Sequence, residues 1–580
     1  MPLPTGQQRV YSAIEYDGEA TLWLVEYAKG QRFKSTRWPF KNGLLIENWT
    51  PSVNADALRI AIRLQASGQF SGGEIVVAAV AETENHKNYA AIWSDLHRPS
   101  AEIKSAKNIC RLSSPPPNDI PFDLRVINIR RKSPIPPETT ETLNRLGFCG
   151  PLVDLTEAET LRGVRPFHML AFSKRRYETS SVFSGAPVCS RHTFFVSHPV
   201  GRPYVFIRFE DGDKVYYEVY CPFHGRRVAI FDPIRNILVQ TLNLEKLIDK
   251  FRCLLLAHAS LVANYLINTG PKQLAVPVGW MSHWGHVLMH ELPGTMRAVE
   301  EAGQAVQWLK GPVAYLDHRQ LFPETSSDAV RIFNDDEAVF KYSLEENALI
   351  IRPQSEFAQL TGECIKRTND ACAKLGQRTG YDDEVRRRIG ASSPVVWIEI
   401  RSNDRIWLNQ VTAIIETAQR LKMRFGNLAV VLAGWSRGPI VRLPDGAEIA
   451  REGAIAYLLN AGLPDVPVHS IIGAQIWQKQ IWASIIDVYV AGFGTGLSFP
   501  HYLAGKPGLT LANAYYLSSE YVDTPSGAGS AVAPSRAPLR VIAGVKTVSS
   551  PRGNPEIDNF TCSAAAVADA ISEVLKETGR

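Results

Sequence analysis

The chain has 580 residues, with 63 Lys and Arg against 58 Asp and Glu, which leaves a formal charge of +5. This surplus is too small to indicate a nucleic-acid partner. Hydrophobic residues make up 45% and charged residues 21% of the sequence, ordinary values that argue against disordered, collagen-like and coiled-coil classes. At roughly 100–200 residues per domain, the length predicts three or four folded domains.

No stretch reaches the roughly 18–20 uncharged apolar residues of a membrane span, and no basic segment followed by an apolar run opens the sequence. The eight cysteines are scattered, which is typical of a protein in a reducing compartment. We therefore predict a cytoplasmic protein, with peripheral attachment to the inner membrane kept open.

The first 130 residues predict an antiparallel β-sandwich. Short apolar runs such as residues 73–81 are separated by Asp-Gly, Ser-Gly and Gly-Gly turns, and apolar and basic residues nearly alternate over residues 57–64. Residues 113–117, with three consecutive prolines, begin the exit linker.

Residues 131–390 begin with β-rich sequence and then alternate between strands and helices. The Asp211-Gly212-Asp213 sequence predicts a hairpin turn between two such strands. The later elements that we expect are a helix over residues 244–267, a strand over 273–279, a helix over 282–303 and a strand over 313–317. Alternating strands and helices predict a parallel sheet covered by helices.

Residues 391–580 predict a doubly wound α/β domain, whose ligand should lie at the carboxyl ends of its strands. The expected strands cover residues 395–400, 428–433, 466–472, 487–491 and 508–512. The expected helices cover residues 407–425, 448–461, 474–486 and 564–577, and a surface loop is expected over 527–538.

The strongest local motif is a glycine-rich turn after the fourth of these strands, with Gly494, Thr495, Gly496 and Leu497 leading into an expected helix. Glycines allow close approach of the backbone, and a helix N-terminus offers N–H groups to a phosphate. The turn lacks the third glycine of a dinucleotide fingerprint and the Gly-Lys-Ser/Thr of a P-loop. A tight turn without any ligand is the alternative.

Arg401 and Arg405 follow the first strand of the same domain, where guanidinium groups could bind a diphosphate bidentately. A solvated loop with local ion pairs is the alternative. Trp435, in a polar loop after the second strand, and His501, four residues beyond the glycine turn, are secondary candidates.

Three histidines, His283, His286 and His290, recur at spacings of three and four, so they would share one face of a helix, with Glu291 close to it. An imidazole can remove a proton from an acceptor hydroxyl, particularly beside a carboxylate. Ordinary partly buried histidines or a zinc site are the alternatives, although the His-Glu-x-x-His pattern is missing.

Two further patterns imitate metal sites. Cys189 with His192 and Cys221 with His224 each form Cys-x-x-His, which resembles a zinc or Rieske ligand set with unsuitable spacing. We therefore predict no metal ligands.

At this point the sequence resembles glycosyltransferases of the GT-B type, in particular bacterial capsule and surface-polysaccharide enzymes related to the family 61 transferases. The resemblance rests on His-Trp-x-His-x-x-x-x-Glu-Leu-Pro from His283 to Pro293, paired with Asp-x-x-x-x-x-x-Gly-x-Gly-Leu from Asp487 to Leu497. It covers about residues 273–580 and implies two Rossmann-like domains that face each other, over residues 131–390 and 391–580. The β-sandwich predicted for residues 1–130 lies outside the resemblance.

The resemblance also implies an inverting, metal-independent transfer of a sugar from a nucleotide-sugar donor to a saccharide or protein acceptor. Arg401, Arg405 and the glycine turn would then stabilise the leaving diphosphate, and His283 or His286 would act as the base, with Glu291 orienting or replacing it. No cofactor is implied, because the nucleotide sugar is a substrate.

The first 130 residues would then bind carbohydrate or dock the enzyme, with Trp23, Trp38 and Trp49 as stacking platforms unless they pack in the core. Two alternatives stay open for the whole chain. One is a non-catalytic carbohydrate- or nucleotide-binding protein that retains the fold, and the other is an α/β enzyme, such as an epimerase, that uses the same turn for a sugar phosphate.

Overall fold

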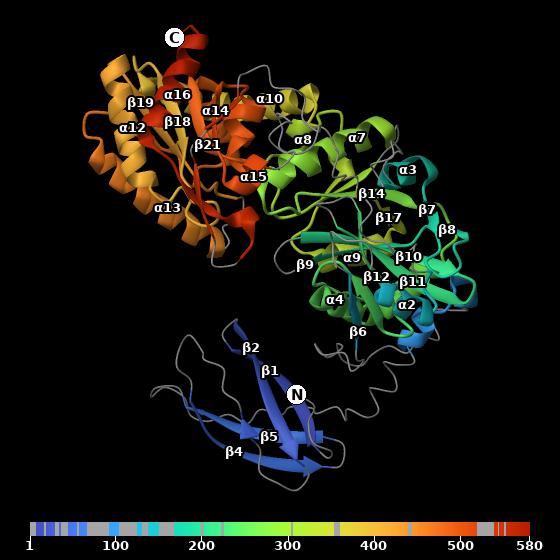
Figure 1. Ribbon diagram of the computed structural model, residues 1–580. Coiled ribbons are helices and arrows are strands. Elements are labelled where there is room, and N and C mark those ends of the chain that lie inside the picture. The colour runs from blue at the N-terminus through green and yellow to red at the C-terminus, as the bar shows by residue number, and fades with distance from the viewer. Residues whose placement is uncertain are drawn as a thin grey trace. The chain divides into compact units, whose positions relative to one another are not determined.

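The computed structural model describes most of the chain, and Figure 1 shows it as a ribbon coloured from the N-terminus to the C-terminus. The described residues are 7–16, 19–28, 34–35, 45–54, 57–65, 92–103, 124–129, 137–149, 167–198, 202–221, 226–302, 306–352, 360–438, 443–518, 539–542, 545–549 and 553–579. Contacts divide the chain into two units, Met1–Leu96 with Lys107–Pro116 and His97–Ala106 with Pro117–Arg580.

The first unit contains antiparallel strands. β1 to β3 form one sheet, and β4 pairs with β5, so the strand expected over residues 57–64 is confirmed. The bounds are β1 (Gln7–Tyr16), β2 (Glu19–Ala28), β3 (Lys34–Ser35), β4 (Leu45–Asn54) and β5 (Ala57–Gln65). The packing of a β-sandwich stays a prediction. The run over residues 73–81, Trp38 and the side chains of Trp23 and Trp49 lie outside the described residues.

The second unit begins with a mixed six-stranded sheet in the order β6-β13-β12-β11-β10-β9. Its strands are β6 (Arg125–Asn128), β9 (Thr193–His198), β10 (Arg202–Asp211), β11 (Lys214–Cys221), β12 (Arg226–Asp232) and β13 (Ile237–Gln240). A smaller antiparallel pair joins β7 (Tyr177–Ser180) to β8 (Pro187–Ser190). The hairpin predicted at Asp211–Asp213 is confirmed, since Asp211 pairs with Lys214 across Gly212.

The mixed sheet is buried on both faces. Successive side chains of a strand point to opposite faces, and in β11 and β13 nearly all of them are buried. Val205 and Ile207 of β10 join the core of the parallel sheet described next, whereas Phe206 stacks on Phe251 of α4 (Glu245–Ala257). The other helices around these two sheets are α2 (Pro137–Arg145), α3 (Phe167–Lys174), α5 (Ala259–Ile267) and α9 (Asp336–Glu345). The single helix expected over residues 244–267 is therefore two helices, α4 and α5, which meet at His258.

A four-stranded parallel sheet follows in the order β16-β15-β14-β17. Its strands are β14 (Gln273–Val278), β15 (Gln307–Lys310), β16 (Val330–Ile332) and β17 (Ala348–Ile350). The helix expected over residues 282–303 is confirmed as α6 (Trp284–His286), the π-turn η4 (Val287–Glu291) and α7 (Leu292–Ala302). The strand expected over residues 313–317 is wrong. The strand lies at β15, and the following turn leads to α8 (His318–Leu321).

The last sheet is parallel and has the order β20-β19-β18-β21-β22-β23, which is the strand order of a Rossmann fold. Its strands are β18 (Val395–Glu399), β19 (Ala429–Ala433), β20 (Val468–Ser470), β21 (Val488–Gly492), β22 (Gly508–Leu511) and β23 (Leu539–Val541). The helices are α10 (Gly362–Thr379), α11 (Tyr381–Ile389), α12 (Gln410–Phe425), α13 (Leu443–Gly462), α14 (Ile476–Ile485), α15 (Ala514–Ser518) and α16 (Ala564–Glu577). A small pair, β24 (Lys546–Val548) and β25 (Asn559–Thr561), completes the chain.

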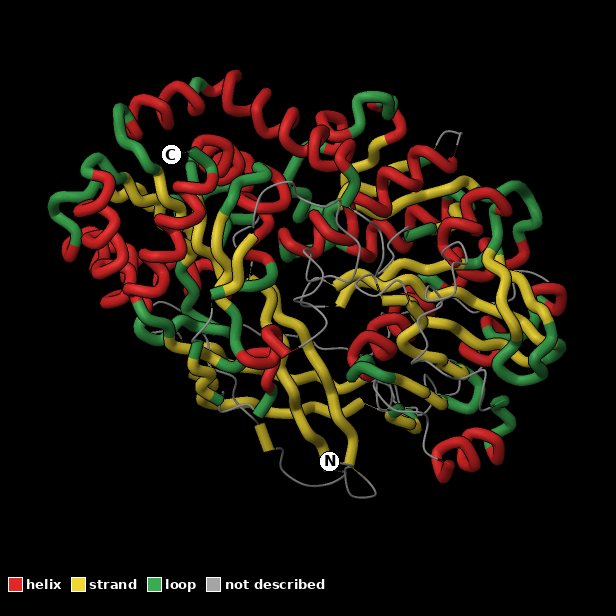
Figure 2. Tube along the Cα trace, turned by 45° about the horizontal axis from the view of Figure 1, so that its top comes forward, coloured by secondary structure: helices red, strands yellow, loops and turns green. Residues whose placement is uncertain are grey.

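Helices cover both faces of this sheet, and its central strands β18, β19 and β21 are buried over almost their whole length. Val396 and Ile398 of β18 pack with α12 and α16, whereas Val395 and Trp397 pack with α10 and α14. Figure 2 shows helices on the two sides of the strands near the C-terminus. The strands expected in residues 391–580 and the helices expected over 407–425, 448–461, 474–486 and 564–577 are thus confirmed, and the chain is α/β with parallel sheets. The loop expected over residues 527–538 lies outside the described residues.

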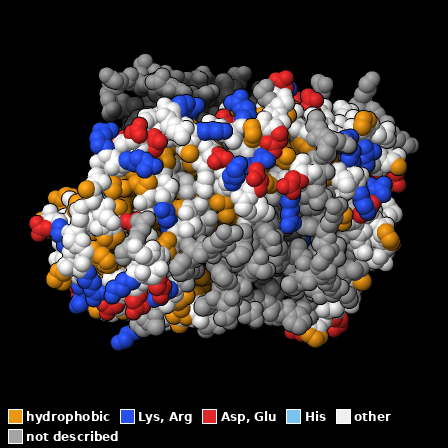
Figure 3. Space-filling view, turned by 90° about the horizontal axis from the view of Figure 1, so that it is seen from above, with side chains coloured by type: hydrophobic (Ala, Val, Ile, Leu, Met, Phe, Trp, Pro, Cys, Tyr) orange, Lys and Arg blue, Asp and Glu red, His pale blue; other side chains and the backbone are white. Residues whose placement is uncertain are grey.

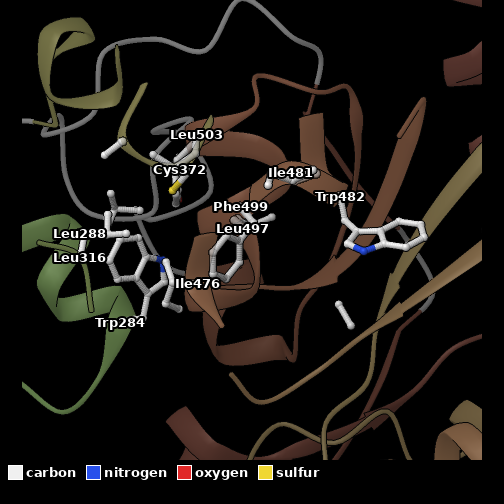
Figure 4. Packing of buried hydrophobic residues seen from close by; sticks show 14 of the residues in the cluster. Trp284, Leu288, Leu316, Cys372, Ile476, Ile481, Trp482, Leu497, Phe499 and Leu503 are labelled. Atoms are coloured by element: carbon white, nitrogen blue, oxygen red, sulfur yellow. The ribbon is translucent and has the colours of Figure 1, made fainter. Parts of the chain in front are cut away.

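One apolar core joins the segment after β14 to the last sheet. Figure 4 shows Trp284 and Leu288 beside Phe499 and Leu497, and the rings of Trp284 and Phe499 stack with centroids 6.0 Å apart. On the surface, charged side chains of both signs are interspersed (Figure 3), in keeping with the small net charge. Among the described helices, none is long and apolar enough to cross a membrane.

Candidate functional site

The segments that follow β14 and β18, the first strands of the two parallel sheets, line one cavity, which we call the switch-point cavity. In the last sheet the strand order reverses between β18 and β21, and ligands of open α/β sheets bind outside the carboxyl ends of the strands at such a point. The cavity has a volume of about 300 Å³. Its lining includes Ser282, His283, Gly285, Tyr315, Glu399, Arg401, Arg405, Trp435, Glu452, Lys479, Thr495 and Gly496.

The glycine turn packs directly on a carboxylate at the end of β18. Gly492 N–H donates to Glu399 Oε2 at 2.7 Å, and a Cβ at Gly496 would lie 1.8 Å from the same oxygen. Across the cavity, a Cβ at Gly285 would lie 2.2 Å from Thr495 Cγ2. The glycines are therefore required for close approach, both within the turn and between the two sheets' loops.

The sequence predicted a regular α-helix after the glycine turn, and this prediction is wrong. A 3₁₀ turn (η6, Thr495–Leu497) and a π-turn (η7, Ser498–Leu503) take its place. Such short elements align few peptide dipoles, so the cationic groups of this cavity are side chains.

Arg401 and Arg405 both line the cavity. Arg401 Nε lies 3.5 Å from Glu399 Oε1, and its Nη2 donates to Thr495 Oγ1 at 3.4 Å. Arg405 Nη1 donates to the carbonyl oxygen of Phe493 at 3.1 Å. Burial, together with the charge of Arg401, lowers the pKa of Arg405. The charges of Glu399 and Asp404, which also line the cavity, act on Arg405 in the opposite direction.

A third cation lies in the cavity, and sequence analysis missed it. Lys479 of α14 is 1% exposed, and its Nζ donates to the carbonyl oxygen of Gly434. Burial lowers the pKa of Lys479 to about 8, against the opposing charges of Glu452 and Glu399. A lone charged residue in an otherwise uncharged helix was the signal that could have revealed it.

Glu452 of α13 is the acidic neighbour of Lys479. Its carboxylate accepts the backbone N–H of Trp435, and burial raises its pKa to about 7. A Cβ at Gly434 would lie 2.3 Å from Glu452 Oε2, so this glycine also permits a close contact. Near pH 7 the pair presents a protonated lysine beside a carboxyl group that is partly protonated.

His283 reaches the cavity from the other sheet. It caps α6, and its ring lies edge-to-face with Trp435 at a centroid distance of 6.1 Å. Its Nδ1 is enclosed and has no hydrogen-bond partner among the described residues. Burial, followed by the charges of Arg401 and Arg405, lowers the pKa of His283 to about 4. The imidazole is therefore neutral at pH 7 and able to accept a proton.

The structure brings His283, Arg401, Arg405, Trp435, Thr495 and Gly496 together around the switch-point cavity, as expected from the sequence. His286 lies behind His283, with ring centroids 5.0 Å apart, and does not line the cavity. Gly494 supports the turn through a positive φ of 105° without lining the cavity.

Three other candidates lie elsewhere in the core. Leu497 is fully buried against Trp284 and its neighbours. His501 is 1% exposed and contacts the rings of Tyr489 and Tyr502. Glu291 is 6% exposed and accepts Gly279 N–H, so it does not orient His283 directly.

Within the described part of the chain, no cluster of three or more His, Cys, Asp or Glu side chains could hold a metal ion. His224, a member of the Cys-x-x-His pair with Cys221, lies outside the described residues.

The sequence matches no family model and no curated protein. Among solved structures it is similar to the C-terminal domain of a group 1 glycosyltransferase from Francisella tularensis, with 12% identity over 34% of this chain and 83% of that one and a TM-score of 0.20. It is also similar to the trehalose 6-phosphate synthase of Burkholderia multivorans (12% identity, 58% of this chain, 70% of that one, TM-score 0.26) and to the heptosyltransferase WaaC of E. coli (11%, 52%, 99%, 0.26). TM-scores this low carry no inference about function, which has to rest on the site itself.

Proposed function

We propose that the chain is a glycosyltransferase that moves a sugar from a nucleoside-diphosphate donor to a hydroxyl of a saccharide or protein acceptor, with inversion at the anomeric carbon. One observation carries the proposal. The switch-point cavity gathers Arg401, Arg405 and Lys479, and His283 of the other sheet also lines it. Cations suit a leaving diphosphate, and a neutral imidazole suits an acceptor hydroxyl.

The three cations supply the charge that departure of the donor requires. When the bond between the anomeric carbon and the diphosphate oxygen breaks, its electron pair passes to the nucleoside diphosphate. Arg401 is paired only loosely with Glu399, at 3.5 Å, so its guanidinium is available for bidentate contact with a phosphate. These groups can do the work of a metal ion, and the proposed transfer is therefore metal-independent and needs no cofactor.

His283 is proposed as the base. The acceptor O–H bond breaks, its proton goes to the imidazole, and the acceptor oxygen bonds to the anomeric carbon on the side opposite the leaving diphosphate. Attack from that side inverts the configuration. The resemblance of the two sequence motifs to bacterial capsule and surface-polysaccharide transferases supports a role in surface glycan synthesis.

The alternative is a non-catalytic carbohydrate- or nucleotide-binding protein with the same cavity. One observation favours it: Nδ1 of His283 lacks a carboxylate partner among the described residues, and such a partner would strengthen a base. Both hypotheses require nucleotide binding, but only the first requires turnover.

Calorimetry with UDP, GDP, CDP, ADP and CMP, with and without Mg²⁺, tests the binding that both hypotheses share. We expect one nucleoside diphosphate to bind without Mg²⁺ and to bind at least about tenfold more weakly to Arg401→Ala, since a charge-assisted hydrogen bond contributes about 1.5–3 kcal/mol. Arg420→Ala, which removes an exposed arginine paired with Glu416 on α12, is the matched control. Absence of binding by all five nucleotides would overturn the proposal.

A further inference from the structure

The loop between β14 and α6 carries His283 into the cavity and is attached at several points. Gly279 has a φ of 70°, and a Cβ there would lie 2.7 Å from Ala314 Cβ. Trp280 Nε1 donates to the carbonyl oxygen of Leu309 at 3.0 Å. Tyr315 OH donates to the carbonyl oxygen of Ser282 at 2.5 Å. The backbone that precedes His283 is therefore fixed from strand end to helix start.

Glu291 makes the contact at the beginning of this loop. Its Oε1 accepts Gly279 N–H at 2.8 Å, and its Oε2 lies 3.3 Å from Arg352 Nη2. The side chains of Glu291 and Arg352 are 7% and 2% exposed. Arg352 follows β17, the neighbour of β14, so the pair ties together the carboxyl ends of two adjacent strands.

Burial is the largest effect on the ionisation of both members of the pair. Burial raises the pKa of Glu291, while Arg352 and the N–H groups of Gly279 and Trp280 oppose that effect. Burial lowers the pKa of Arg352 to about 10. Glu291 also ends the π-turn Val287–Glu291, in which Leu292 N–H donates to the carbonyl oxygen of Val287, and π-turns are frequent at functional sites.

We propose that Glu291 is a positioning residue, which fixes Gly279 and thereby holds the His283 ring in the switch-point cavity. This inference rests on the proposed function for its catalytic consequence, although the positioning itself does not require it. Glu291 does not contact the cavity, so it acts through the loop and not on the substrate. Its hydrogen bond to Gly279 N–H is the element that the inference requires, and Arg352 balances the charge.

Single substitutions are poor tests, because removal of one member of a buried ion pair leaves an unpaired charge and destabilises the fold. Two double variants avoid this. Glu291→Gln with Arg352→Met removes both charges and keeps an acceptor for Gly279 N–H. Glu291→Met with Arg352→Met removes both charges and the acceptor, and Gln and Met have similar length. The two proteins therefore differ in the side-chain acceptor that position 291 offers to the N–H groups of Gly279 and Trp280.

Amide hydrogen exchange over residues 279–283 is the first readout, and it needs no substrate. We expect exchange to be near that of the wild type in the Gln variant and roughly five- to a hundredfold faster in the Met variant, the range for loss of one buried hydrogen bond. Equal exchange in the two variants would overturn the inference. Melting temperatures of both confirm that the comparison is made between folded proteins.

Turnover is the second readout. We expect the Met variant to lose kcat by a similar factor, with the KM and the calorimetric affinity for the donor unchanged, because Arg401, Arg405 and Lys479 are untouched. The Gln variant should retain kcat. Equal kcat in the two variants would overturn the catalytic consequence. Failure of the wild type to turn over any donor would instead count against the proposed function, while the exchange result would still decide the positioning.

Discussion

Replacement of Arg401 by Met removes one of the two guanidinium groups that act on the His283 ring, and we expect the pKa of His283 to rise. Burial is the largest cause that lowers this pKa from 6.5 to about 4, and the charges of Arg401 and Arg405 come next. This lowering of the pKa of His283 disfavours its protonated form by roughly 3 kcal/mol. Since burial is the larger part and Arg405 remains, the rise in Arg401→Met should be roughly 0.5–1 in pKa.

An NMR titration of protein labelled at Cε1 of its 13 histidines measures this rise, with the His283 signal assigned through His283→Gln. Arg420→Met, whose arginine pairs with Glu416 on an exposed face of α12, is the control that should leave His283 unchanged. Inorganic pyrophosphate should also raise the pKa in the wild type, because its negative charge opposes both guanidinium groups. A pKa of His283 that changes in neither experiment would refute the electrostatic coupling.

Three further outcomes are expected. Affinity for a nucleoside diphosphate should fall as pH rises through about 8, where Lys479 loses its proton, and calorimetry at pH 7 and 9 should find no such fall in Lys479→Arg. The pKa of Lys479 is lower in the folded than in the unfolded chain, so the unfolded chain binds more protons between pH 8 and 10.5. The free energy of unfolding, measured in urea, should therefore rise over that range by up to roughly 3 kcal/mol in the wild type. Lys479→Met should lack this rise. Gly496→Ala, whose Cβ would collide with Glu399, should cost roughly 1–3 kcal/mol of stability and weaken nucleotide binding, whereas Gly453→Ala on α13 has open space and should do neither.

The alternation of strands and helices in the last domain was predictable from sequence, because β18, β19 and β20 lie in short, mainly apolar segments that are each followed by a helix. The mixed sheet was harder to predict, since its order depends on pairings between strands distant in the chain, such as β6 with β13. The wrong strand over residues 313–317 has a similar cause. Val313 and Leu316 are buried by tertiary contacts and not by a ladder of hydrogen bonds, so their apolar character imitated a strand.

The candidate site was predictable where its residues follow strands directly, as Arg401, Arg405 and the glycine turn do. Lys479 and Glu452 could not be assigned to the cavity from sequence, because they lie in the middle of helices α14 and α13. These helices approach the cavity only through tertiary packing, which the sequence pattern does not reveal. Helical spacing also suggested that Glu291 would assist His283. The π-turn ends that regularity, and the carboxylate instead bonds to Gly279.

The most direct test of the proposed transfer is the configuration of the sugar released from a bound nucleotide sugar, followed by ¹H NMR in the wild type and in His283→Gln. We expect the wild type to release, with water as acceptor, the anomer opposite to that of the donor, and His283→Gln to bind the donor with unchanged affinity while releasing sugar far more slowly. Release with retained configuration would contradict the inverting mechanism. Tight donor binding without any release or transfer would instead identify the chain as a binding protein.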